Sequence, residues 1–172
     1  MTPFKLDKAD VLVVGAGIMG AGIAQAAAQA GHRVLLFDAR AGAAQQAAAK
    51  LGATLDALVA KGKLAADAVE ATLARIEPLA ALEEAGKVDL VIEAIVENLD
   101  AKRGLFQQLE SLLSANCVLA SNTSSISVTA IANFMTDKLG PSRSILAVVL
   151  AGALVTYGGV SLFVAMFVIA PM

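Results

Sequence analysis

The stretch VLVVGAGIMGAGIAQAAAQAGHRVLLFD, residues 11–38, decides the fold. It opens with an apolar run over residues 11–14, which is typical of a buried strand. Residues 18–30 are rich in alanine, the best helix former, and are predicted to be a helix. A second apolar run, residues 34–37, ends at an aspartate. A strand, a turn, a helix and a strand in this order predict two parallel strands joined by a right-handed crossover.

The turn in the middle of this unit reads GAGIMG over residues 15–20 and matches the pattern G-x-G-x-x-G. Gly15 permits a tight turn, Gly17 lets a pyrophosphate approach the backbone, and Gly20 allows the helix to pack closely on the strand. The uncapped N–H groups and the positive dipole at the start of the helix favour phosphate. The pattern therefore predicts a dinucleotide-binding turn. The alternative is a glycine-rich turn with no ligand.

Asp38 ends the second strand, 18 residues after Gly20. A carboxylate at this position accepts hydrogen bonds from both ribose hydroxyls and repels the extra phosphate of NADP, so NAD is the predicted cofactor. Arg40 lies close by in the sequence and would weaken that discrimination. The alternative role for Asp38 is to cap the helix that follows.

The remaining elements complete an α/β fold, a Rossmann-type doubly wound and mainly parallel sheet with an inserted helix pair. The helix pair covers residues 41–60 and 65–75, with a break at Lys61-Gly62-Lys63 and a stop at Pro78. Strands and helices then alternate, which favours parallel strands with helices on both faces. We expect strands at residues 88–94 and 118–120 and helices at residues 98–114 and 124–134.

Polar side chains follow both of these later strands. The segment SNTSS, residues 121–125, lies at the carboxyl edge of the sheet, where its hydroxyls and amide would orient a substrate carbonyl or hydroxyl. The same residues also suit a cluster that caps a helix. Glu93, Glu97 and Lys102 are expected, from the residues alone, to form an ordinary solvated helix start.

Composition excludes several classes of protein. The chain of 172 residues is 58% hydrophobic and 16% charged, with a net charge of −2, which excludes a disordered chain and a basic nucleic-acid arm. The charged N-terminus does not resemble a signal peptide. The single histidine, His32, precedes the second strand, so it is expected in a loop at the amino edge, about 15 Å from cofactor chemistry. The single cysteine, Cys117, is expected to be a buried small hydrophobe, and no metal site is predicted.

The C-terminal part of the chain differs from the rest, because Arg143 is the last charged residue. We expect a nucleotide-binding domain over residues 1–140 and a hydrophobic tail over residues 141–172. Residues 145–169 are long and apolar enough for a transmembrane helix. Alternatively, residues 145–150 form the next buried strand and the remainder covers an edge of the sheet.

Three segments together resemble the NAD-binding domain of the 3-hydroxyacyl-CoA dehydrogenases, which include the 3-hydroxybutyryl-CoA and 3-hydroxyadipyl-CoA enzymes. The resemblance covers residues 8–138 and rests on VLVVGAGIMGAGIAQAAAQAGHRVLLFDAR, DLVIEAIVENLDAKRGLFQQLE and ASNTSSISVTAIA. It implies an oxidoreductase of fatty-acid metabolism and β-oxidation, which converts a 3-hydroxyacyl-CoA and NAD into a 3-oxoacyl-CoA and NADH.

The resemblance also implies roles for individual residues. Ser124 would contact the substrate hydroxyl and the nicotinamide, while Thr54 and Lys61 fall where contacts with coenzyme A are expected. Lys61 also suits a phosphate as a point charge at a helix end. The positions implied to bind NAD are Gly15, Gly17, Ile18, Met19, Gly20, Asp38, Glu97, Lys102 and Asn122.

The resemblance stops near residue 138. In the family, a His-Phe-Phe-Asn-Pro segment about 20 residues after the equivalent of Ser124 supplies the general base, and a helical domain follows. Here residues 144–148 contain no histidine. A positioned base contributes about 10²–10⁴-fold to such a reaction, so the chain alone is predicted to be a poor catalyst.

Three interpretations of the whole chain follow from these observations. It is a shortened dehydrogenase that needs a complementing chain with the helical domain, or a non-enzymatic NAD-binding module tethered to a membrane through residues 145–169. The third interpretation is a truncated or out-of-frame product. The expected location is the cytoplasm, with membrane attachment through the tail as the alternative.

Overall fold

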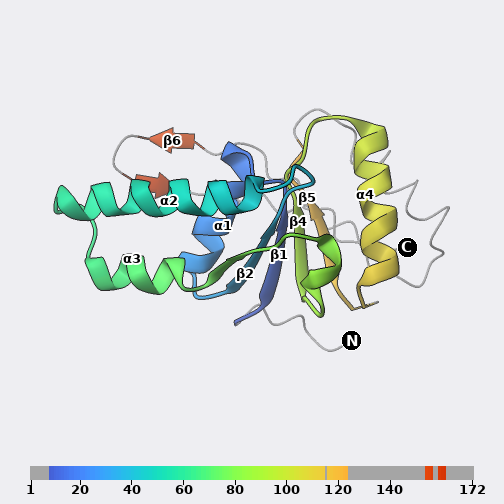
Figure 1. The fold of residues 1–172 in the computed structure, drawn as a ribbon, viewed down its shortest axis with the longest axis horizontal. Helices are drawn as coiled ribbons and strands as arrows, with labels where there is room; N and C mark the ends of the chain where they lie inside the picture. Colours follow the sequence, from blue (N-terminus) through green and yellow to red (C-terminus); the bar gives the residue numbers. More distant parts are fainter. Residues whose placement is uncertain (1–7, 115, 124–153, 157–158, 162–172) are drawn as a thin grey trace.

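The computed structural model describes residues 8–114, 116–123, 154–156 and 159–161. Its centre is a five-stranded sheet in the order β3-β2-β1-β4-β5, in which every neighbouring pair is parallel (Figure 1). The predicted fold class is therefore confirmed. The strands are β1 (Asp10–Val14), β2 (Arg33–Phe37), β3 (Ile76–Pro78), β4 (Leu90–Glu93) and β5 (Val118–Ser121).

Helices cover both faces of this sheet. The first three helices lie on one face and the fourth lies on the other (Figure 1). All four were expected, and their ends differ from the predicted ones by at most a few residues. They are α1 (Ile18–Gln29), α2 (Ala43–Ala60), α3 (Ala66–Leu73) and α4 (Leu99–Leu112), with a short 3₁₀ turn at Leu82–Ala85 that was not predicted.

The side chains of β1 explain why this strand is apolar throughout. Successive residues of a strand point to opposite faces. Leu12 therefore packs in the cluster that contains Phe106 of α4, whereas Val13 packs in the cluster that contains Ile23 of α1. All of these side chains are buried. A strand covered on both faces has no solvent side, so polar residues do not alternate along it.

Strand β3 was missed by the sequence analysis. Residues 65–75 were predicted to be helical up to the stop at Pro78, but α3 ends at Leu73 and residues 76–78 pair with β2. The backbone N–H of Val34 also donates to the carbonyl of Arg75 at 2.8 Å. Pro78 is tolerated because β3 is an edge strand, where a missing N–H leaves no neighbour unpaired.

The tail is described only in part. Leu154–Thr156 (β6) and Gly159–Ser161 (β7) form an antiparallel pair within the stretch considered above for a membrane helix. In the part of the chain that the structure describes, no helix has the length and apolarity needed to cross a membrane. The predicted helix at residues 124–134 and the predicted strand at 145–150 lie outside the described residues.

Candidate functional site

The order of the strands places a topological switch point, where open α/β sheets have their ligand crevice, at one edge of the sheet. The chain moves outward from β1 to β2 and β3, and then returns to the other side of β1 to build β4 and β5. Loops that leave β1 and β4 therefore diverge to opposite faces, and ligands of open α/β sheets bind at this switch point, beyond the carboxyl ends of the strands. The glycine turn, Asp38 and Glu93 all lie at this edge.

Two glycines of the turn are required by packing. Gly15 has a φ of +107°, and a Cβ there would lie 2.7 Å from the carbonyl carbon of Ala94, just beyond β4. The Gly15 N–H donates to the carbonyl of Phe37 at 2.7 Å. A Cβ on Gly20 would collide with the carbonyl oxygen of Gly15. These contacts match the tight turn and the close helix–strand packing predicted for Gly15 and Gly20.

The third glycine leaves open space in front of α1. Gly17 is the N-cap residue of this helix and has an ordinary φ of −70°, and a Cβ there would meet no atom within 4 Å. No side chain caps the helix, and Ile18 is 92% exposed beside it. Uncapped N–H groups at an open helix start suit a pyrophosphate. The residues of the turn therefore fit the predicted dinucleotide.

Asp38 connects the end of β2 to the glycine turn. Its Oδ2 accepts from the N–H of Ala16 at 2.8 Å, and its Oδ1 accepts from the N–H of Arg40 at 2.9 Å. The Arg40 guanidinium binds both carboxylate oxygens, at 2.9 and 3.0 Å. Hydrogen bonds from Arg40 lower the pKa of Asp38 from 3.8 to about 2. Asp38 does not cap α2, whose N-cap is Gly42, so that alternative is wrong.

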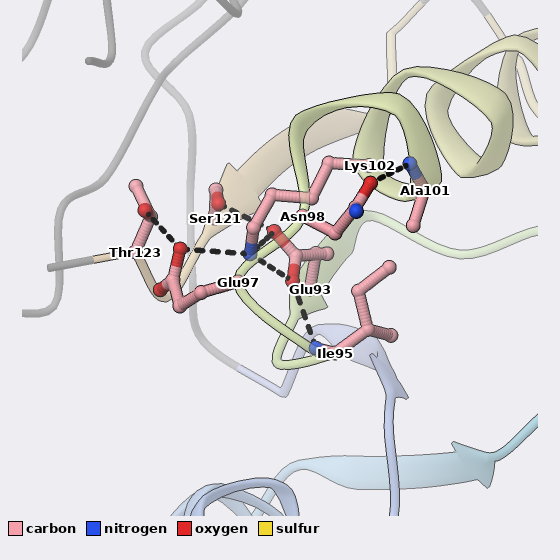
Figure 2. Close-up of polar contacts among 8 residues, drawn as sticks. All are labelled: Glu93, Ile95, Glu97, Asn98, Ala101, Lys102, Ser121 and Thr123. Carbon is pink, nitrogen blue, oxygen red and sulfur yellow. Dashed lines mark hydrogen bonds and ion pairs between the residues drawn. The ribbon is translucent and has the colours of Figure 1, made fainter. Parts of the chain in front are cut away.

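A buried ion pair lies at the ends of β4 and β5 (Figure 2). The Glu93 and Lys102 side chains have no exposed surface, and the Lys102 Nζ lies 2.6 and 2.8 Å from the two Glu93 oxygens. Glu93 also accepts from the N–H of Ile95 at 2.8 Å and from the Ser121 hydroxyl at 2.5 Å. The expectation of a solvated helix start is therefore wrong for Glu93 and Lys102.

Glu97 continues this cluster toward the crevice. Its side chain is 36% exposed, its Oε2 accepts from the Thr123 hydroxyl at 2.9 Å, and the same oxygen lies 3.9 Å from the Lys102 Nζ. The backbone N–H of Asn122 donates to the carbonyl of Glu93 at 2.7 Å. The structure therefore brings Glu97, Lys102 and Asn122 together at one edge. Ser124, the next predicted site residue, lies outside the described residues.

The two residues predicted to contact coenzyme A lie elsewhere. Thr54 is exposed on α2, about 16 Å along the helix from Ala43, and its hydroxyl donates to the carbonyl of Lys50 at 2.8 Å. Lys61 is the exposed C-cap residue of the same helix. Neither lines the mainly apolar hollow of about 450 Å³ between α2 and α3, whose walls are Asp56, Val59, Ala66, Val69, Glu70, Leu73 and Ala74.

His32 and Cys117, to which the sequence analysis gave no functional role, lie where they were expected. His32 directly precedes β2, and its backbone N–H donates to the carbonyl of Ala27 at the end of α1, so it lies at the amino edge of the sheet. Cys117 is 7% exposed, and burial raises the pKa of its thiol to about 11, with the charge of Asp89 as a smaller cause.

Together, the strand order, the open glycine turn at the switch point and the carboxylate at the end of β2 define a dinucleotide-binding domain of the Rossmann class. The particular family follows from comparison with known proteins. The family described as "3-hydroxyacyl-CoA dehydrogenase, NAD binding domain" matches residues 10–143, and the chain belongs to this family. The predicted family and the predicted cofactor, NAD, are thereby confirmed.

Individual relatives agree with this membership. The chain is 47% identical over 122 residues to a 3-hydroxyadipyl-CoA dehydrogenase of Escherichia coli K12 and 43% identical over 122 residues to a probable 3-hydroxybutyryl-CoA dehydrogenase of Bacillus subtilis. Each match covers 71% of this chain. The chain spans 26% and 42% of the lengths of these two relatives.

A solved structure shows the same fold. The crystal structure of a 3-hydroxybutyryl-CoA dehydrogenase from Escherichia coli K12 superposes with a TM-score of 0.75 at 40% sequence identity. The superposition covers 84% of this chain and 30% of the other. The likeness therefore extends over the cofactor domain described above.

Proposed function

We propose that this chain is the cofactor-binding part of an enzyme that oxidises the hydroxyl of a 3-hydroxyacyl-CoA to a ketone. In that reaction the carbon gives a hydride to NAD and the hydroxyl gives a proton to a base, so the products are a 3-oxoacyl-CoA and NADH. The observation that carries the proposal is the open start of α1 at Gly17, flanked by carboxylates at the ends of β2 and β4. Names of the relatives support the choice of substrate.

The adenosine half of NAD would bind on the β2 side of the switch point. The N–H groups beside Gly17, Ile18 and Met19 would receive the pyrophosphate, because a helix start favours negative charge. Asp38 would accept hydrogen bonds from the adenosine ribose. Since the Arg40 guanidinium occupies both oxygens of Asp38, it would have to rotate away, which its 73% exposure permits.

The nicotinamide half would then extend over the ends of β4 and β5. A dinucleotide that crosses the switch point from the β2 side reaches this edge next. Glu97, Lys102 and Asn122 lie there, and Ser124 follows in the sequence. We assign the direct contacts with the nicotinamide riboside to Glu97, Asn122 and Ser124, while the buried Lys102 supports them through its ion pairs.

The substrate's coenzyme A would contact the outer face of α2. Lys50, Thr54 and Lys61 are separated by four and seven residues, so they lie on one exposed stripe of the helix. Two ammonium groups and a hydroxyl along such a stripe suit phosphate and amide groups. We therefore expect coenzyme A to bind along this stripe.

Among the described residues, the carboxyl edge of the sheet holds no histidine that could accept the proton of the substrate hydroxyl. The only histidine in the sequence lies at the amino edge, separated by the length of β2 from the crevice. We therefore propose that the base comes from the His-Phe-Phe-Asn-Pro segment of the family, which these 172 residues do not contain. NADH formation from 3-hydroxybutyryl-CoA should be slow with these residues alone and should rise when a polypeptide carrying that segment and the helical domain is added. A turnover of about 1–10³ s⁻¹ by the chain alone would contradict the proposal.

Cofactor selection tests the ribose assignment directly. Asp38→Ala should weaken NAD binding about tenfold or more, because a hydrogen bond to a charged group contributes about 1.5–3 kcal/mol. It should also narrow the difference between NAD and NADP, since the repelling charge is lost. Titration calorimetry with both cofactors measures these effects. Glu77→Ala removes a carboxylate that pairs with Arg33 on β2, and it should leave both affinities unchanged.

A further inference from the structure

Glu93 is a buried carboxylate that cannot touch the cofactor. Its side chain has no exposed surface, and both of its oxygens already accept two contacts each. The donors come from three parts of the fold, namely α4, the loop after β4, and the end of β5 (Figure 2). Any effect of Glu93 on cofactor binding must therefore be transmitted through one of these partners.

Lys102 is the partner that faces a second carboxylate. Its Nζ lies within 2.8 Å of both Glu93 oxygens but 3.9 Å from the Glu97 Oε2, which is beyond hydrogen-bond distance. The Thr123 hydroxyl holds that same Glu97 oxygen at 2.9 Å. The carboxylates of Glu93 and Glu97 thus compete for the Lys102 ammonium group, and the buried Glu93 carboxylate binds it.

This competition decides where the Glu97 carboxylate lies. If Glu93 were neutral, the buried ammonium of Lys102 would be left with Glu97 as its nearest opposite charge, and an uncompensated buried charge is costly. The two groups would close the gap of 3.9 Å, which would draw the Glu97 carboxylate inward. Glu97 would then be less able to accept hydrogen bonds at the crevice.

We propose that Glu93 is a positioning residue that holds Lys102 away from Glu97, so that the Glu97 carboxylate stays directed at the ribose on the nicotinamide side of NAD. This inference rests on the placement of the cofactor proposed above. It predicts a defect confined to one half of the dinucleotide. A residue that only stabilised the fold would affect both halves equally.

The test compares NAD with ADP, which lacks nicotinamide and its ribose, in the full chain. Glu93→Gln keeps the shape of the side chain and removes its charge. We expect its affinity for NAD to fall about tenfold, the loss of a hydrogen bond to a charged group, and its affinity for ADP to stay within about twofold. Glu77→Gln is the matched control, because it neutralises an exposed carboxylate 2.7 Å from Arg33, and both affinities should be unchanged.

Equal losses of NAD and ADP affinity in Glu93→Gln, or no loss of either, would overturn the inference. If this variant does not fold, as judged by circular dichroism, Glu93→Asp decides the question, since it keeps the charge and withdraws the carboxylate from Lys102 by one methylene. Glu93→Asp should weaken NAD binding selectively and by a smaller factor. Unchanged or equally weakened binding of both ligands would again overturn the inference.

Binding by the unmodified chain separates this inference from the function on which it rests. If the unmodified chain binds ADP but gains nothing from the nicotinamide riboside of NAD, the proposed placement of the cofactor fails. If it binds NAD more tightly than ADP and Glu93→Gln keeps that advantage, only the role of Glu93 fails.

Discussion

At the scale of single residues, Asp38 has both a structural and a binding role. Its carboxylate holds the N–H of Ala16 in the glycine turn and pairs with Arg40, and the same oxygens are those proposed to receive the adenosine ribose. The carboxylate therefore helps to shape the turn before any cofactor binds. Its low pKa follows from the same contacts.

The lowered pKa of Asp38 predicts a pH-dependent contribution to stability. The ionised form is favoured in the folded state, so the contribution is complete above the ordinary pKa of 3.8 and is lost as the pH falls toward about 2. Asp38→Asn should therefore be less stable than the parent at pH 5, and this difference should shrink steadily between about pH 4 and pH 2. Urea unfolding at several pH values measures it. A difference that stayed constant would contradict the assigned cause.

Gly17 gives a second prediction at this scale. Its φ is compatible with alanine, and a Cβ would meet no atom of the protein, so Gly17→Ala should fold with nearly unchanged stability. The added methyl group would nevertheless occupy the space assigned to the pyrophosphate, and NAD binding should fall at least about tenfold. Thermal unfolding and calorimetry on the same sample separate the two effects. Tight NAD binding by this variant would mean that the pyrophosphate lies elsewhere.

At the scale of elements, α1 contains one glycine that packing requires and another that it does not. Gly20 faces the carbonyl of Gly15, whereas Gly22, two positions further on, is exposed with no atom near a Cβ. Both lie in the same helix and differ only in what surrounds them. They therefore form a matched pair for substitution.

Alanine at these two positions should change stability in opposite directions. Gly20→Ala should lower the free energy of unfolding by about 1–3 kcal/mol or more, because overpacking forces backbone shifts. Gly22→Ala should leave it unchanged or raise it by up to about 1 kcal/mol, because alanine favours the helix. Urea denaturation of both variants measures the two effects. Similar losses in both would show that the close contact of Gly20 is not what limits packing.

The elements themselves were largely predictable from the sequence. Apolar runs and alanine-rich stretches carry local signals, so β1, α1, β2, α2, α3, β4, α4 and β5 were all expected. β3 was not expected, because three residues ending in proline carry no strand signal and form a strand only by pairing with β2. The Glu93–Lys102 pair was missed for a related reason: nine residues separate them, and only the packing of α4 on the sheet buries both.

At the scale of the whole molecule, the core between the sheet and α4 buries residues from distant parts of the chain. Cys117 is the only cysteine in the sequence and lies at the start of β5, in the cluster packed under α4. The cluster also contains Leu12 of the central strand β1. Access to the thiol therefore requires opening of that core.

This burial predicts slow reaction of Cys117 with thiol reagents. Burial raises its pKa to about 11, and the thiolate is the reactive form, so at pH 8 the folded chain should react at least about 100-fold more slowly than the urea-unfolded chain. Saturating NAD should slow the reaction further, because a ligand at 100 times its Kd stabilises the folded state by about 2.7 kcal/mol. Absorbance with an aromatic disulfide reagent measures both rates. Fast labelling of the folded chain would show that this core opens locally.

The sequence by itself determined the fold class, the family and the cofactor. These depend on local patterns, namely the glycine spacing, the apolar runs and the aspartate 18 residues after Gly20, each of which can be recognised without knowing what lies nearby in space. Only the tertiary structure decided that Glu93 and Lys102 are buried partners, that Glu97 lies beside Thr123, and that Arg40 covers Asp38. Charge and burial depend on what surrounds a side chain, and the sheet brings those surroundings together from distant parts of the chain.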